Sequence, residues 1–191
     1  MGMKNRIHYE NRSLSRRMFL KVVGWLAVAG GILKIPGIAR AQEKTDIISE
    51  KVRFEGKGVA LGGYLSRPAG KGPYPGIIVI HENRGITDYI QDVTRNLAKE
   101  GYVGLSVNLV SRSLGADYPG GSDEARNALG KLSDAEAMAD LDAGVEYLKR
   151  QPVVFTNSIG CMGFCMGGRF SLLFAAHRKD LKAAVVFYGR P

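Results

Sequence analysis

The stretch SIGCMGFCMGGRFSLLF, residues 158–174, places Cys165 between glycines where one structural pattern gives way to another. The apolar run before Cys165 is typical of a buried strand, and the residues from Met166 onward are typical of a helix. Strand, Gly-X-Cys-X-Gly and helix form the pattern of a nucleophile elbow, with Cys165 at the position of the serine in G-x-S-x-G. We therefore expect the thiol to lie above the carboxyl end of a sheet, beside a helix N-terminus that favours the thiolate.

The glycines around Cys165 have a steric explanation. In such a turn, Gly163 and Gly167 lie where side chains would collide with the neighbouring strand and helix. The glycine spacing does not follow G-x-G-x-x-G, which excludes a dinucleotide-binding loop. The alternative to a catalytic cysteine is a buried structural cysteine in a glycine-rich turn.

Strands and helices alternate along the rest of the chain. Two short strands around Gly58 are expected within residues 51–68, and the β-branched run GIIVIHE predicts a buried strand over 76–82. The other expected elements are helices over 86–101, 133–151 and 166–178, strands over 102–110, 157–164 and 181–189, and a polar loop over 111–131. The helix at 133 opens with the capping box Ser133 to Glu136. This alternation predicts a doubly wound, mostly parallel α/β sheet.

A second motif, HENRG at residues 81–85, lies at the end of the expected GIIVI strand. In an α/β-hydrolase this position supplies half of the oxyanion hole. Together with GFCMGG (163–168) and FYGRP (187–191), HENRG resembles the dienelactone hydrolase family, most closely its cysteine-nucleophile branch. The resemblance runs from about Val52 to Pro191. It implies an α/β-hydrolase fold and hydrolysis of a small ester or lactone.

The resemblance also implies roles for residues of both motifs. Cys165 would be the nucleophile that attacks the carbonyl carbon, and Glu82 would lie beside the resting thiol and help to take its proton when substrate arrives. The backbone N–H groups of Asn83 and Met166, each following a matched position, would stabilise the oxyanion. The alternative for Glu82 is a local ion pair with Arg84.

Two further residues have expected roles, and no metal or organic cofactor is implied. Arg112 matches the arginine with which family members bind a substrate carboxylate, although Val107-Asn108 replaces the Pro-Asp common before it. The alternative for Arg112 is a solvated loop arginine. We expect His81 to pack or hydrogen-bond beside the site rather than to act as a base.

The expected histidine base of Cys165 is missing after the elbow. A cysteine hydrolase of this type needs a histidine oriented by a carboxylate, in the order nucleophile, acid, histidine. The one histidine after Cys165 is His177, twelve residues along the same helix and so roughly 18 Å away. The apolar run over 183–188 would also leave an exposed strand edge. We therefore expect a C-terminally truncated fragment of a longer hydrolase, inactive or nearly so by itself and poorly soluble.

The first 41 residues explain the basic charge of the chain. Lysine and arginine number 27 against 18 acidic residues, but eight of the basic residues and one acid lie within 1–41. The nearly neutral remainder has no basic patch, which excludes nucleic-acid binding. SRRMFLK (15–21) and the uncharged run over 22–33 resemble a twin-arginine signal, cleaved near Ala41. The alternative is an amphipathic or anchoring helix.

A twin-arginine signal implies an export route. The mature hydrolase domain would then comprise residues 42–191, without a stable membrane span after cleavage. It would lie in the periplasm or outside the cell. The expected partners are the twin-arginine export machinery and a small ester or lactone substrate.

Two other functions fit part of the sequence. One is a non-catalytic remnant, which equally slow modification of Cys161 and Cys165 by a thiol reagent would favour. The other is a redox-sensing thiol, which would need a resolving cysteine. Cys161, expected as a small core residue, is poorly placed for that role, and its position across a strand-to-turn junction disfavours a disulfide with Cys165.

Overall fold

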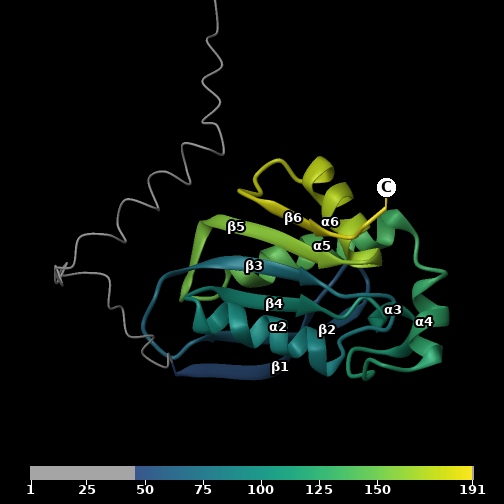
Figure 1. The fold of residues 1–191 in the computed structure, drawn as a ribbon, viewed down its shortest axis with the longest axis horizontal. Helices are drawn as coiled ribbons and strands as arrows, with labels where there is room; N and C mark the ends of the chain where they lie inside the picture. The colour runs from purple at the N-terminus through teal and green to yellow at the C-terminus, as the bar shows by residue number, and fades with distance from the viewer. Residues whose placement is uncertain (1–45, 191) are drawn as a thin grey trace, which may run out of the picture. The chain divides into compact units, whose positions relative to one another are not determined.

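A six-stranded sheet organises the chain in the computed structural model, which describes residues 46–190 (Figure 1). The expected signal segment and its cleavage point lie outside these residues. The strands are β1 (Ile47–Glu55), β2 (Ala60–Pro68), β3 (Tyr74–Ile80), β4 (Val103–Val107), β5 (Val154–Phe164) and β6 (Ala184–Phe187). Their order is β1-β2-β4-β3-β5-β6, in which β3 to β6 are parallel and β2 is antiparallel to both β1 and β4. The predicted mostly parallel α/β sheet is confirmed.

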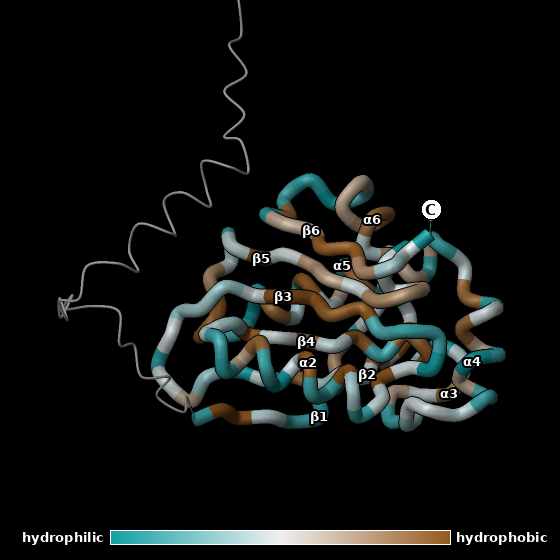
Figure 2. The backbone as a smooth tube through the Cα atoms, viewed as in Figure 1, coloured by the Kyte–Doolittle hydropathy of each residue, from teal (hydrophilic) through white to brown (hydrophobic). Residues whose placement is uncertain are grey.

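Strand β3 is the buried centre of the sheet and carries the first motif to its edge. Ile78, Val79 and Ile80 have no exposed surface, and Figure 2 shows the hydrophobic run ending where the hydrophilic HENR segment begins. The strand ends at Ile80 and not at Glu82 as expected, because His81 and Glu82 turn away from the β-ladder. The side chains of the motif therefore lie beyond the carboxyl end of the strand.

Helices cover both faces of the sheet. Neighbouring residues of a strand point to opposite faces. Val79 packs with Ile90 of one helix, whereas Ile78 belongs to a larger core that includes Leu141 and Phe174 of two others. The helix α2 thus lies on one face, and α5 and α6 lie on the other (Figure 1). Their bounds are α2 Asp88–Lys99, α5 Asp134–Lys149 and α6 Met166–His177.

The segment 111–131, expected as a loop, contains two short helices. They are α3 (Ser111–Leu114) and α4 (Asp123–Leu129). The side chain of Ser122 caps α4 by accepting a hydrogen bond of 3.0 Å from the N–H of Ala125. Glycines surround both helices, which is why the local sequence pattern resembles a loop. The expectation of a structureless loop was wrong.

Helix α5 begins with the predicted capping box. The Ser133 hydroxyl accepts the N–H of Glu136 at 3.3 Å, and the Glu136 carboxylate accepts the N–H of Ser133 at 3.0 Å. Both bonds satisfy backbone donors that an α-helix leaves free at its N-terminus.

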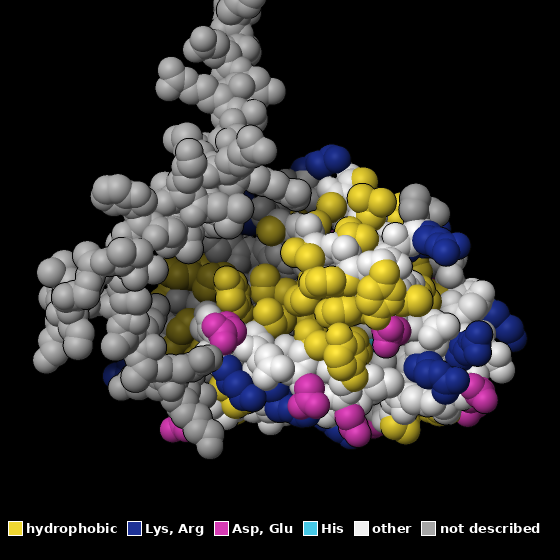
Figure 3. Space-filling model, in the orientation of Figure 1, with side chains coloured by type: hydrophobic (Ala, Val, Ile, Leu, Met, Phe, Trp, Pro, Cys, Tyr) yellow, Lys and Arg dark blue, Asp and Glu magenta, His cyan; other side chains and the backbone are white. Residues whose placement is uncertain are grey.

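Strand β6 presents an apolar edge at the surface. Its side chains are all exposed, among them Val186 and Phe187. Within residues 46–190, β6 pairs with β5 alone. Figure 3 has the orientation of Figure 1 and shows hydrophobic side chains gathered in the middle of the face that it presents. An exposed apolar edge of this kind is a template for aggregation.

Candidate active site

Cys165 occupies a strained turn between β5 and α6. Its φ of 54° and ψ of −116° lie in a region that residues other than glycine rarely adopt. It is the single residue between the end of the strand at Phe164 and the start of the helix at Met166. The thiol therefore stands at the carboxyl end of β5 and the N-terminus of a 12-residue helix, in the geometry expected of a nucleophile elbow.

The glycines of the turn allow three backbone segments to touch. A Cβ on Gly163 would collide with the carbonyl of Gly167, and a Cβ on Gly167 would collide with the carbonyl of Ile80. The expected steric role of both glycines is confirmed. Because Ile80 ends β3, the same contacts bring the HENRG motif next to the elbow.

The end of β6 is attached to the other side of the elbow. The N–H of Cys165 donates a hydrogen bond of 3.1 Å to the carbonyl of Phe187. The rings of Phe164 and Phe187 stack with their centroids 4.7 Å apart. The following residue, Tyr188, has a φ of 40° and thus leaves the strand in a conformation that non-glycine residues rarely adopt.

Tyr188 brings a phenol to Glu82. Its hydroxyl donates a hydrogen bond of 2.7 Å to Oε1 of Glu82, across 106 residues of sequence. This bond is the main reason why the pKa of Tyr188 rises to about 12. The phenol and the carboxylate form a hydrogen-bonded pair, and the residue before Tyr188 accepts the N–H of Cys165. We expected the Glu82 carboxylate to lie beside the Cys165 thiol. Within residues 46–190, the Glu82 carboxylate accepts a hydrogen bond from Tyr188, and no hydrogen bond joins it to Cys165.

The alternative ion pair for Glu82 is not observed. Arg84 instead donates to the carbonyl of Gly121 at 2.8 Å and pairs with Asp123 at 3.2 Å. Tyr188 is the residue of this pair for which the sequence predicted no role. The sequence signal that could have identified Tyr188 is its position directly after β6, the strand that pairs with β5.

The two expected oxyanion donors lie after β3 and at the start of α6. Asn83 directly follows Glu82, and Met166 opens α6. Among the hydrogen bonds of the described chain, neither backbone N–H is a donor. Their expected role as donors to an oxyanion stays a prediction.

Neither histidine of residues 46–190 serves Cys165. His81 is fully buried; its Nδ1 donates to the carbonyl of Glu82 at 2.6 Å, and its Nε2 accepts the N–H of Leu109 at 3.1 Å. The predicted hydrogen-bonding role of His81 is confirmed. His177 ends α6, where its Nε2 lies 2.8 Å from the carboxylate of Asp142 on α5.

Arg112 is held by a buried carboxylate. Its Nε and Nη2 donate to Asp140 at 3.0 and 2.6 Å, and the Asp140 side chain has no exposed surface. Burial raises the pKa of Asp140, and the Arg112 guanidinium opposes that rise. Arg112 is thus not the solvated arginine of the alternative interpretation. Its expected contact with a substrate carboxylate stays a prediction.

Cys161 is the small core residue that was predicted. Its side chain is 2% exposed, its Sγ lies 3.3 Å from the hydroxyl of Ser171, and burial raises the pKa of its thiol. Cys161 and Cys165 are both free, so no disulfide joins them. The redox interpretation therefore finds no accessible resolving thiol within residues 46–190.

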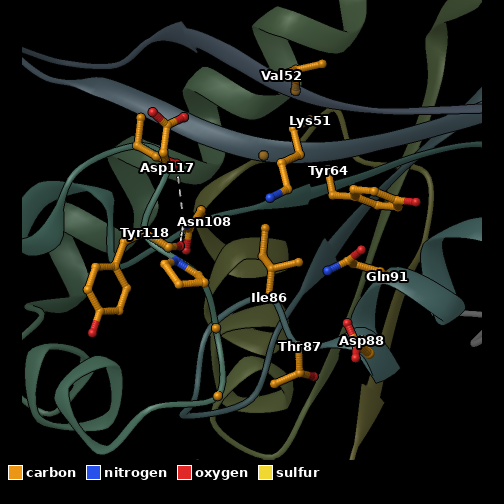
Figure 4. Close-up of a pocket in the computed structure, with 15 residues that line it drawn as sticks. Lys51, Val52, Tyr64, Ile86, Thr87, Asp88, Gln91, Asn108, Asp117 and Tyr118 are labelled. Carbon is orange, nitrogen blue, oxygen red and sulfur yellow. Dashed lines mark hydrogen bonds between the residues drawn. The ribbon is translucent and has the colours of Figure 1, made fainter.

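A cavity of about 400 Å³ lies between β1, β2, the start of α2 and the loop over 116–121 (Figure 4). Lys51, Tyr64 and Asn108 are among its lining residues. The amide nitrogen of Asn108 donates to the carbonyl of Tyr118 at 3.0 Å and fastens the loop, while its Oδ1 has no partner. None of Cys165, Glu82, Asn83, Met166 and Arg112 lines this cavity.

Comparison with known proteins shows the family of the chain. Residues 61–191 match the dienelactone hydrolase family. The chain belongs to this family. A carboxymethylenebutenolidase of Methylorubrum extorquens is 33% identical over 183 residues, which are 93% of this chain. A 2-oxo-3-(5-oxofuran-2-ylidene)propanoate lactonase of a Bradyrhizobium species is 36% identical over 126 residues, or 66% of this chain.

Solved structures of the family share the fold. A dienelactone hydrolase from Klebsiella pneumoniae superimposes with a TM-score of 0.68 and 33% identity, over 76% of this chain and 61% of that one. The chain spans 62% of the Methylorubrum relative and 50% of the Bradyrhizobium relative. Within residues 46–190, every helix is too short or too polar to cross a membrane.

Proposed function

We propose that this member of the dienelactone hydrolase family carries the nucleophile and oxyanion half of an ester- or lactone-hydrolase site. The observation that supports the proposal most directly is the strained backbone of Cys165 between β5 and α6. A φ of 54° at a residue with a side chain costs free energy, and such strain gathers at catalytic turns. The names of the relatives, a carboxymethylenebutenolidase and a lactonase, indicate the substrate class.

In the proposed acylation, Glu82 takes the proton of the Cys165 thiol when substrate arrives, and the Sγ of the resulting thiolate attacks the carbonyl carbon of the ester or lactone. The N–H groups of Asn83 and Met166 bind the oxyanion of the tetrahedral intermediate. Loss of one such donor typically slows the reaction about a hundredfold or more. The carbon–oxygen bond then breaks, the alkoxide oxygen takes the proton back from Glu82, and the acyl group stays on Cys165 as a thioester.

Deacylation needs a base that can activate water. Among the described residues, His81 has both ring nitrogens engaged and His177 lies at the far end of α6. We therefore propose that this chain is acylated but turns over slowly or not at all by itself. No cofactor takes part in the proposed chemistry.

If Arg112 also binds a substrate carboxylate, Arg112 must either release Asp140 or contact both carboxylates at the same time.

The test is a stopped-flow assay of the full chain with p-nitrophenyl acetate. We expect a burst of p-nitrophenolate equal to the protein concentration, little turnover after it, and one acetyl group on the peptide that holds Cys165. Cys165→Ala should abolish the burst, whereas Cys161→Ala, the matched control, should keep it because Cys161 is buried. A burst that survives in Cys165→Ala, or the absence of acetylation in the unmodified chain, would contradict the proposal.

Export by the twin-arginine route is a separate proposal, supported by the Arg16-Arg17 pair and the uncharged run after it. Residues 1–41 fused to a folded reporter should direct it out of the cytoplasm. Replacement of Arg16 and Arg17 by lysine should keep the reporter inside. Equal export of both fusions would refute this route.

A further inference from the structure

We propose that the cavity between β1, β2 and the start of α2 binds a small hydroxylated carboxylate. Its volume of about 400 Å³ lies within the range of small-molecule sites. Residues of β1, β2, α2 and the loop over 116–121 line it, together with Asn108 after β4 (Figure 4). This site goes beyond the proposed function, because neither Cys165 nor Glu82 takes part in it.

Asn108 supplies a buried acceptor that lacks a hydrogen-bond donor. The residue is 4% exposed, and its Nδ2 donates to the carbonyl oxygens of Tyr118 and Ala116 at 3.0 and 3.5 Å. These two bonds fix which end of the amide carries the oxygen. Among the buried side-chain polar atoms of residues 46–190, Oδ1 of Asn108 alone has no partner. Buried acceptors are normally satisfied, so a ligand hydroxyl group is the donor that this wall of the cavity needs.

Two positively charged features line the same cavity. Lys51 of β1 forms no ion pair within the described chain, and Figure 4 shows its ammonium group pointing into the space beside Ile86. Thr87 and Asp88 bring the N-terminus of α2 to the cavity. The Thr87 side chain does not cap the helix, and the N–H groups of Asp88 and Tyr89 donate to no hydrogen bond among residues 46–190. An ammonium group and a free helix N-terminus both favour an anionic group.

The two carboxylates of the lining leave the Lys51 charge available. Asp117 is paired with Arg53, whose Nε donates to it at 2.8 Å. Asp88 lies in the first turn of α2, and no ion pair within the described chain joins it to Lys51. A carboxylate near Lys51 and the start of α2, with a hydroxyl group near Asn108, therefore matches the groups that lack partners. A small hydroxylated carboxylate carries both.

The experiment is saturation-transfer NMR on the full chain with three probes. γ-Hydroxybutyrate carries a carboxylate and a hydroxyl group, butyrate lacks the hydroxyl group, and butanediol lacks the carboxylate. The variants are Lys51→Met and Asn108→Ala. Lys71→Met is the matched control, because Lys71 is also exposed and without an ion pair in the described chain but does not line the cavity. Circular dichroism verifies that each variant is folded.

We expect γ-hydroxybutyrate to bind saturably, and butyrate and butanediol to bind about tenfold more weakly, because each lacks one of the two recognised groups. Lys51→Met should weaken γ-hydroxybutyrate about tenfold, and Lys71→Met should leave its affinity unchanged. In Asn108→Ala, the advantage of γ-hydroxybutyrate over butyrate should disappear. If Asn108→Ala does not fold, the comparison of the probes and of the two lysine variants still decides the outcome.

The absence of saturable γ-hydroxybutyrate binding, or equal affinity for the three probes, would overturn the inference. The same holds if Lys51→Met binds as the unmodified chain does, or if Lys71→Met loses as much affinity as Lys51→Met. None of the probes contains an ester or a lactone, so this outcome is independent of acylation at Cys165. A chain without an acylation burst can still bind γ-hydroxybutyrate, and a chain with a burst can fail to bind it.

Discussion

The imidazole of His81 accepts the backbone N–H of Leu109 at 3.1 Å and so joins the ends of two parallel strands, β3 and β4. Because a backbone N–H can only donate, Nε2 of His81 must be unprotonated and Nδ1 must carry the proton that it donates to the carbonyl of Glu82. The buried neutral ring therefore fixes the backbone from which Glu82 and Asn83 extend.

This bond predicts a loss of stability in mild acid. Burial lowers the pKa of His81 from 6.5 to about 4. Between these two pH values, His81 is protonated in the unfolded chain and neutral in the folded chain. Stability from this group is complete above pH 6.5 and is lost as the pH falls toward 4, by about 3 kcal/mol in all. In His81→Gln, the dependence of the free energy of unfolding on pH between 7 and 4 should be flatter. Urea denaturation at several pH values measures it, and an unchanged slope would contradict the assignment.

The elbow glycines predict a steric cost. Gly163→Ala and Gly167→Ala should each lower the free energy of unfolding by about 1–3 kcal/mol or more, because the new methyl group meets backbone carbonyls that cannot move aside. Gly130→Ala is the matched control. Gly130 has a helical φ of −65°, and its Cβ would meet nothing closer than 3.5 Å. The control should be neutral or stabilising, by up to about 1 kcal/mol. Similar urea midpoints for all three variants would refute the packing argument.

The buried ion pair between Arg112 and Asp140 should contribute more to the free energy of unfolding than an exposed ion pair does. Arg112→Met leaves the buried Asp140 carboxylate without a partner and should cost about 3–5 kcal/mol at pH 7. Burial raises the pKa of Asp140, so the variant should regain stability as the pH falls and the carboxyl group takes up a proton. Arg53→Met is the control, since Arg53 and Asp117 are 66% and 65% exposed and such pairs contribute less than about 1 kcal/mol. Equal losses in the two variants would show that burial of the pair is not decisive.

Local patterns predicted the central parts of the fold because their physical causes are local. A strand buried on both faces needs a continuous apolar run, and a sharp strand-to-helix turn needs glycines at fixed spacing, so β3 and the Cys165 elbow could be found without coordinates. The capping box of α5 is equally local, since its bonds join residues three apart. The short helices α3 and α4 were missed because glycine-rich flanks conceal segments of only four and seven residues.

The amino-acid sequence by itself was therefore enough to predict the sheet, the elbow and Cys165 as a candidate nucleophile. Only the tertiary structure decided which side chains meet there, because those contacts depend on strand order and register over long separations. The pairing of β5 with β6 brings Tyr188 to Glu82, and the packing of α5 brings Asp140 to Arg112, 28 residues away in the sequence. Each partner follows its own local rules, and only the folded sheet makes them neighbours.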